Sequence, residues 1–147
     1  MVREHYTIDS TPDYLVHRFQ SHGNQGVIDK LVVFEELEGN RYNLAFGDVI
    51  DGKLRDEVIS NNFDLVKTVS TIATTINLFF QKYPSAILEF DAVDEKRLKL
   101  YNRVMARRFL EIEKTFHIKG IRSGVEENYQ LGHFYYKFVI ETKADKL

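Results

Sequence analysis

The sequence predicts a single α+β domain over residues 1–147, with two helices packed on a mostly antiparallel sheet in the order strands, helix, strand, helix, strands. Three observations predict this class. The length of 147 residues suits one domain. Short segments with strand-like patterns fill the chain up to about residue 60, and two longer segments with helical spacing follow. A short apolar run separates the two helical segments.

The N-terminal part reads as paired strands. Residues 31–46, LVVFEELEGNRYNLAF, contain two extended runs around an E-G-N turn at 38–40. The second run alternates apolar and polar residues from Tyr42 to Phe46, which predicts one buried face. A D-G pair at 51–52 predicts another turn and a further strand after it.

The middle of the chain changes to helical spacing. A first helix is predicted from Asn62 to about Tyr83, where a proline ends it. The run AILEF at 86–90 predicts a short buried strand, and a second helix is predicted from about Asp94 to Phe116. The apolar residues of the first helix fall in one arc of about 120°; they are Leu65, Val69, Ile72, Ala73, Ile76, Phe79, Phe80 and Tyr83.

The C-terminal part is predicted to close the sheet. Gly120 and Gly124 predict turns, and residues 133–141, HFYYKFVIE, predict a strand. His133 begins that strand, and it could do acid–base work if its face borders a pocket. Surface exposure is the simpler expectation for all five histidines. The opposite, buried face of the strand is predicted to carry Phe134, Tyr136, Phe138 and Ile140.

Composition excludes several classes of function. The chain has no cysteine, so it forms no disulfide, cysteine-ligated zinc site or thiol nucleophile. The histidines lack metal-ligand spacing, and no phosphate-binding or nucleophile-elbow motif is present. We therefore expect no cofactor and no metal. The absence of a signal-like or spanning apolar run predicts a cytoplasmic protein with no membrane partner.

Positive charge is concentrated in the second helical segment. Residues 95–122 contain nine basic and three acidic residues, a net charge of +6, whereas the whole chain carries −2. A solvated helix face explains most of this charge. The residues predicted on that face are Lys96, Lys99, Arg103, Arg107 and Lys114.

Two arginines of this helix point in another direction. Arg97 and Arg108 fall inside the border of its apolar stripe, and Arg97 can meet Tyr101 one turn later. Each arginine could form a structural clamp with a strand carboxylate such as Glu89 or Asp48. Alternatively, an arginine fork beside the tyrosine hydroxyl could bind a phosphate or carboxylate. The candidate anion-binding residues are Arg97, Tyr101, Arg108, Asn62 and Lys67.

The first helix carries an unusual neutral polar face. Threonine is a mediocre helix former, so these residues require a reason other than helix propensity. A partner or a second subunit covering this face would supply one. The candidate interface residues are Ser70, Thr71, Thr74, Thr75 and Asn77.

The chain resembles an uncharacterised family of small bacterial proteins, mainly from Bacteroidetes, that forms a domain of unknown function. The resemblance spans about residues 40–140 and is carried by the order of four elements: N-L-A with G-D at 43–48, N-N-x-D followed by K-x-x-x-T at 61–71, R-x-K-L-Y at 97–101, and Y-x-x-F at 135–138. Phe63 and Lys99 depart from the pattern, where glycine and arginine are expected. The resemblance implies no known activity.

Two functions of different classes remain open, and the sequence does not decide whether the protein is an enzyme. The leading hypothesis is a non-enzymatic binding or interaction module, with a protein partner or as a homodimer. The alternative is an enzyme or toxin-like factor that acts on nucleic acid or a nucleotide through the basic second helix. Such binding should weaken steeply with salt.

Overall fold

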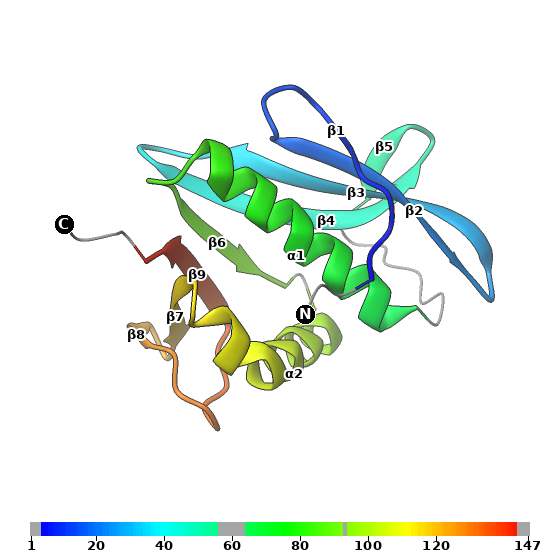
Figure 1. Ribbon diagram of the computed structural model, residues 1–147. Helices are drawn as coiled ribbons and strands as arrows, with labels where there is room; N and C mark the ends of the chain where they lie inside the picture. Colours follow the sequence, from blue (N-terminus) through cyan, green and yellow to red (C-terminus); the bar gives the residue numbers. More distant parts are fainter. Residues whose placement is uncertain (1–3, 56–63, 93, 144–147) are drawn as a thin grey trace. The chain divides into compact units, whose positions relative to one another are not determined.

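The computed structural model describes residues 4–55, 64–92 and 94–143. The order of its elements confirms the predicted α+β class (Figure 1). None of the helices in these ranges is long and apolar enough to cross a membrane. The elements are β1 (Asp9–Ser10), β2 (Val16–Gly23), β3 (Gly26–Glu36), β4 (Arg41–Ile50), β5 (Lys53–Arg55), α1 (Leu65–Lys82), β6 (Ile87–Asp91), α2 (Glu95–Ile112), β7 (Phe116–Arg122), β8 (Val125–Asn128) and β9 (Lys137–Thr142).

The strands are hydrogen-bonded in the order β1-β2-β3-β4-β6-β9-β7-β8, and β5 pairs with β4. The β4–β6 pair is parallel. The antiparallel pairs are β1 with β2, β2 with β3, β4 with β5, β6 with β9, β7 with β8, and β7 with β9. The chain divides into two compact units. Unit 1 contains Met1–Glu35 and Leu44–Tyr83, and unit 2 contains Glu36–Asn43 and Pro84–Leu147. The prediction of a single domain stays a prediction.

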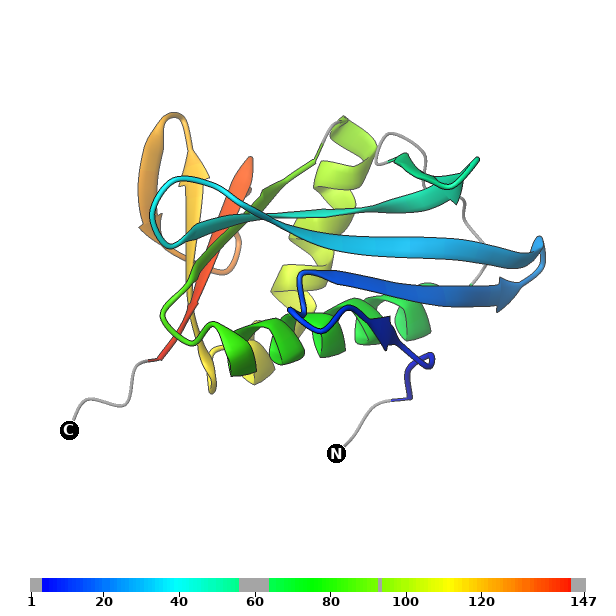
Figure 2. The same cartoon turned by 90° about the horizontal axis from the view of Figure 1, so that it is seen from above.

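In unit 1, α1 lies along one face of strands β2 to β4, as Figures 1 and 2 both show. Phe34 of β3 stacks on Phe79 of α1 with ring centroids 4.4 Å apart, and both side chains are buried. The predicted D-G turn is confirmed, because Asp51 and Gly52 have φ values of 53° and 76° between paired Ile50 and Lys53. Such a two-residue turn with left-handed backbone matches the twist of a hairpin.

Unit 1 also buries charge and a titratable ring, which the sequence did not predict. Lys30 of β3 and Asp48 of β4 form an ion pair with an Nζ–Oδ1 distance of 2.6 Å, and they are 2% and 3% exposed. His17 is fully buried, so the expectation that every histidine lies at the surface is wrong. Its Nε2–H donates to the Tyr14 carbonyl at 2.7 Å, and its Nδ1 accepts from the Ser10 hydroxyl at 2.8 Å. A neutral ring makes both bonds.

Burial lowers the pKa of His17 below the ordinary value, against the smaller opposing effect of the Tyr14 carbonyl. The unfolded chain takes up a proton on His17 at about pH 6.5, whereas the folded chain takes it up only at a lower pH. The stabilisation by the neutral ring is therefore complete above about pH 6.5. It falls as the pH drops toward the lower, folded-state pKa. Urea unfolding should therefore show stability declining from about pH 6.5 to pH 5. His17→Gln should lose this slope while keeping a polar side chain.

The carboxylates provide an internal control for this measurement. Asp64 and Glu89 have pKa values below their ordinary ones, so their contributions are lost only in more acidic solution, below about pH 4. If His17→Gln retains the full decline between about pH 6.5 and pH 5, the buried ring is not the cause of it.

In unit 2, α2 packs against the strands of that unit (Figures 1 and 2). Tyr101 meets Phe90 of β6 edge to face, with ring centroids 6.0 Å apart, and the Asn102 side chain bonds both backbone groups of Tyr135 at 2.8 Å. Leu98 and Met105 of α2 are buried. The helix ends at Ile112 rather than near Phe116.

Two further predictions in unit 2 are wrong. Phe116 and Gly120 both lie within β7, so Gly120 marks no turn, whereas Gly124, with φ 74°, does. The last strand begins at Lys137, and residues 133–136 precede it as a loop. Phe134 and Tyr136 are consequently exposed and Tyr135 is buried, while Phe138 and Ile140 are buried as predicted.

A cluster of three charges joins the first strands of unit 2. Glu89 of β6 accepts from Arg41 of β4 at 2.6 Å and from Lys137 of β9 at 2.9 Å. Burial raises the pKa of Glu89, but these two cations outweigh burial and hold it below its ordinary value. Of the two carboxylates expected to clamp the arginines of α2, Glu89 thus pairs with Arg41 and Lys137, and Asp48 pairs with Lys30.

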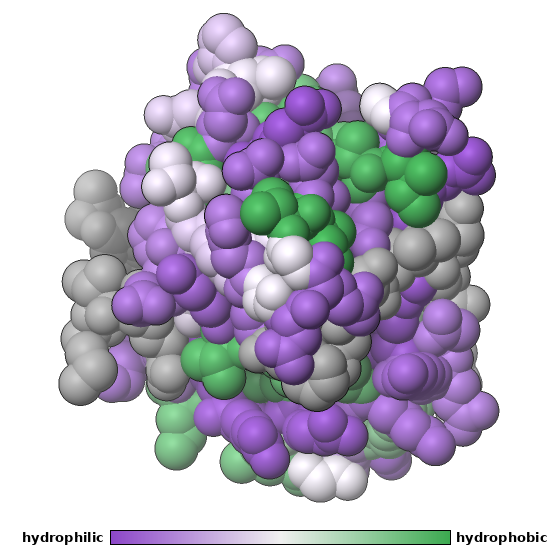
Figure 3. Space-filling model, turned by 90° about the vertical axis from the view of Figure 1, so that its right-hand side faces the viewer, coloured by the Kyte–Doolittle hydropathy of each residue, from purple (hydrophilic) through white to green (hydrophobic). Residues whose placement is uncertain are grey.

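Figure 3 shows one side of the molecule by hydropathy. Most of this side is hydrophilic, and its hydrophobic side chains form small separate groups. Single exposed apolar residues of this kind are ordinary on protein surfaces.

Candidate binding hollow on the β7–β8 hairpin

A surface hollow of about 450 Å³ lies on the β7–β8 hairpin of unit 2 and on the loop that precedes β9. We call it the β8 hollow. The hairpin closes through Ser123 and Gly124, whose φ values of 50° and 74° suit a tight two-residue turn. The hollow is lined by Arg122, Ser123, Val125, Glu127, Phe134 and Tyr136.

Glu127 of β8 is the organising charge of the β8 hollow. Its Oε2 accepts from the Tyr135 hydroxyl at 2.6 Å and from His133 Nδ1 at 2.8 Å, and Arg122 Nε lies 4.0 Å away. All three contacts meet at Oε2, so Oε1 has no hydrogen-bond partner among the described residues. The side chain is 25% exposed. Glu127 therefore offers one carboxylate oxygen to a ligand while the other fixes its position.

These contacts keep Glu127 ionised. The hydrogen bonds from Tyr135 and His133, together with the nearby Arg122, hold the pKa of Glu127 below its ordinary value. The pKa of the Tyr135 hydroxyl is raised, first by burial and then by the carboxylate beside it. The tyrosine therefore keeps its proton and acts as a donor, and the Glu127 carboxylate is negatively charged at neutral pH, with the positive charge of Arg122 4.0 Å from its Oε2.

Tyr135 reaches Glu127 because the strand beneath it contains a glycine. The ring of Tyr135 is fully buried, and a Cβ at Gly120 would lie 2.2 Å from its Cδ1. The same hydroxyl also accepts the backbone N–H of Gln130 at 3.0 Å, which fixes the start of the loop. Gly120, Tyr135 and Glu127 thus form a continuous support under the β8 hollow.

The other wall of the β8 hollow is aromatic and exposed. Phe134 and Tyr136 are 40% and 61% exposed, and their rings meet edge to face with centroids 5.8 Å apart. Val125 on the neighbouring strand is 58% exposed. Ring faces attract cations through their quadrupole. Two exposed rings beside an ionised carboxylate thus form a surface suited to a positively charged group.

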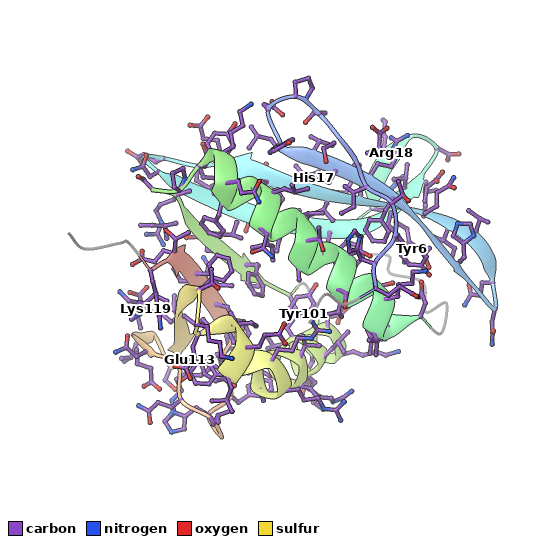
Figure 4. All side chains as sticks on the ribbon, in the orientation of Figure 1. Tyr6, His17, Arg18, Tyr101, Glu113 and Lys119 are labelled. Carbon is purple, nitrogen blue, oxygen red and sulfur yellow. The ribbon has the colours of Figure 1, made fainter. Side chains whose placement is uncertain are left out.

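The predicted anion-binding residues do not all lie in one unit. Arg97, Tyr101 and Arg108 belong to α2 in unit 2, whereas Lys67 belongs to α1 in unit 1. Asn62 lies outside the described residues. Tyr101 (labelled in Figure 4) follows Arg97 by one turn, as predicted.

The Arg97 side chain is only 12% exposed and forms an ion pair with Asp94, Nε to Oδ2, at 3.6 Å. Lys67 instead pairs with Glu4 at 3.3 Å and lies over the Tyr6 ring. The proposal of an anion site at these residues stays a prediction. By contrast, the side chains predicted on the solvated face of the second helix are all exposed, although the last of them lies beyond the end of α2: Lys96, Lys99, Arg103, Arg107 and Lys114.

The predicted outer face of α1 requires a correction. Ser70, Thr71 and Thr75 are 4%, 0% and 0% exposed within the chain itself, so they present no surface to a partner. Thr74 is half-buried, and Asn77 is exposed. Threonines on this helix are used internally: Thr71 Oγ1 accepts the Tyr6 backbone N–H at 2.9 Å and donates to the Lys67 carbonyl at 2.7 Å.

A second polar cluster lies at the start of α1 and has a structural role. The Asp64 carboxylate accepts from the Tyr6 hydroxyl at 2.6 Å and from the Ser21 hydroxyl at 2.5 Å (Tyr6 is labelled in Figure 4). Burial raises the pKa of Asp64, but hydroxyl donors, Ser21 first, outweigh burial and lower it. The cluster fastens the N-terminal segment to β2 and α1, and its donors are satisfied internally.

Sequence reasoning missed the residues of the β8 hollow. It considered His133 as a possible acid–base group, and the structure places that ring on Glu127. Because residues 133–136 were expected to belong to a strand, its alternation placed Phe134 and Tyr136 in the core. They were therefore not considered as candidates for a surface site. The S-G pair at 123–124, followed by the acidic strand VEEN, was the available signal.

Comparison with known proteins gives a family but no activity. Residues 2–143 match the model of a family of unknown function, DUF6934. This match confirms the resemblance to a family of unknown function, and the bacterial origin stays a prediction. No curated protein and no solved structure matches the chain.

Proposed function

The chain belongs to the DUF6934 family of unknown function, and we propose that it is a protein-interaction module whose β8 hollow binds a positively charged side chain of a partner. The observation that carries this proposal is the state of Glu127. Its Oε2 is saturated by Tyr135 and His133, and its Oε1 is left for a ligand. The exposed rings of Phe134 and Tyr136 provide the second contact.

The geometry favours binding over chemistry. His133 is engaged with Glu127 through Nδ1, and Tyr135 is buried with its hydroxyl already donating to the same oxygen. The β8 hollow is thus a preorganised charge beside two rings, which suits recognition of a lysine or arginine side chain. A partner surface that presents such a side chain is the ligand class.

Two variants separate this site from general electrostatic attraction. The probe is n-butylguanidinium, which has the charge of an arginine side chain but no peptide backbone. Glu127→Gln should weaken its binding about fivefold, as expected for loss of a partly exposed ion pair. Tyr136→Leu should weaken it about threefold through loss of a cation–π contact. Affinities are measured from amide chemical shifts in a titration.

The matched control is Glu126→Gln, because Glu126 is the neighbouring acid of β8 and points to the other face of the strand. It removes the same charge from the protein but leaves the β8 hollow intact. Its affinity for n-butylguanidinium should stay within about twofold of the unmodified protein. Equal losses in the Glu126 and Glu127 variants would contradict the proposed site.

Nucleic-acid binding through α2 is the competing proposal. It is supported by the exposed basic side chains on that helix, although Lys99 already pairs with Glu95 at 3.6 Å. A solvated helix face explains the same residues. The β8 hollow carries the stronger argument because its charge and aromatic rings are held in place by buried contacts.

A further inference from the structure

Beside the β8 hollow, the strand β8 itself has an open edge. In unit 2 the strands run β6-β9-β7-β8, so β8 is the last strand of the order and pairs with β7. Figures 1 and 2 both show it at the outer side of the unit's strands. An open edge presents backbone donors and acceptors to another chain.

The register shows which backbone groups point outward. Arg122 and Val125 flank the two-residue turn and form a hydrogen-bonded pair, after which bonded and non-bonded pairs alternate along the hairpin. The Tyr129 N–H bond to the Ile118 carbonyl at 3.0 Å lies where this alternation requires one. Glu126 and Asn128 are therefore non-bonded positions toward β7. Their backbone groups face the open edge, and no described residue bonds to them.

We propose that the partner segment is extended and pairs with the open edge of β8 through its backbone, placing a basic side chain in the β8 hollow. This inference rests on the proposed function and adds the geometry of the partner. Side chains on one face of an added strand lie beside Val125 and Glu127, which line the hollow. Backbone pairing supplies affinity, and the β8 hollow supplies the choice of side chain.

Charge argues for a basic segment rather than for a second copy of this chain. The strand β8 contains two acids, Glu126 and Glu127, and no basic residue. Pairing of two β8 strands would bring carboxylates close together, and like charges across strands are destabilising. A segment with an arginine or lysine opposite Glu127 would instead place a cation near that carboxylate.

The test uses the peptide acetyl-Thr-Arg-Val-Arg-Val-Thr-amide and two versions of it that are N-methylated on alternate residues. The version that is methylated on the N–H groups facing β8 should bind about tenfold more weakly than the parent peptide, because those backbone donors are removed. The version that is methylated on the N–H groups facing away from β8 should bind within about threefold of the parent peptide. This contrast requires no change in the protein. Equal binding of all three peptides would overturn the proposal.

A protein variant gives the complementary result. Glu126→Pro removes an outward N–H and no bond to β7, as proline at a sheet edge allows. It should weaken the peptide about tenfold, while n-butylguanidinium binding stays within about twofold. Glu126→Gln controls for charge, and an amide spectrum checks the fold.

The outcomes are distinguishable. If n-butylguanidinium does not bind the unmodified protein, the proposed function fails. If it binds but Glu126→Pro leaves peptide affinity unchanged, only the edge pairing fails. A dimer, detected by light scattering and broken by Glu126→Pro, would replace the basic segment with a second copy of the chain.

Discussion

Asp48→Ala should lower the free energy of unfolding by about 3–5 kcal/mol, because it removes the carboxylate that forms an ion pair with the buried Lys30 ammonium. Lys30 is 2% exposed, and its Nζ lies 2.6 Å from Asp48 Oδ1. Urea unfolding at neutral pH measures the change. Glu35→Ala is the control, since this carboxylate lies on the same hairpin but is exposed, and it should change stability by less than about 0.5 kcal/mol.

A double variant separates the ion pair from simple packing. Lys30→Met with Asp48→Leu removes both charges and keeps apolar volume, so it should recover most of the stability lost in Asp48→Ala. A loss below about 1 kcal/mol in Asp48→Ala would show that the lysine is neutralised by something other than this aspartate.

Gly120→Ala should destabilise the protein by about 3 kcal/mol and abolish binding at the β8 hollow. The added Cβ would lie 2.2 Å from Cδ1 and 2.4 Å from Cγ of the buried Tyr135 ring. The hydroxyl of that ring donates the hydrogen bond that positions Glu127. Displacing the ring therefore disturbs the β8 hollow as well as the core. Chemical unfolding measures the loss of stability, and the n-butylguanidinium titration measures the loss of binding.

The cause of this effect can be isolated. In a Tyr135→Leu background the same Gly120→Ala change should cost clearly less, since the ring is gone, and the difference is the coupling between the two positions. Gly124→Asn is the matched glycine control. Its turn position has φ 74°, a Cβ added there would have no atom within 4 Å, and asparagine tolerates this backbone. Equal costs of Gly120→Ala in both backgrounds would contradict the role of the ring.

Local rules predicted the parts of the fold that local chemistry determines. The D-G turn at 51–52 and the start of the second helix near Asp94, whose carboxylate accepts from the Arg97 N–H at 2.8 Å, follow from side-chain and backbone preferences. The exposed basic face of α2 followed from its spacing alone. These features depend on neighbours within a few residues.

Features that depend on distant strands were not predictable from spacing. The neutral residues of α1 looked like an outer face, but Thr71 is covered by the N-terminal segment through the Tyr6 N–H. Gly120 looked like a turn residue, whereas it is required by the ring of Tyr135 on a neighbouring segment. The burial of polar residues such as His17 could not be predicted, because composition does not indicate which groups will be their hydrogen-bond partners.

The most direct test of the central claim is a titration of the unmodified protein with n-butylguanidinium and, in parallel, with uncharged 1-pentanol, followed by backbone amide spectra. We predict saturable binding of the cation, with about millimolar affinity. We also predict shifts confined to the hairpin and the loop around Arg122, Glu127 and Tyr136, and little effect of the alcohol. No saturable shifts at these residues, or equal shifts with both compounds, would contradict the claim.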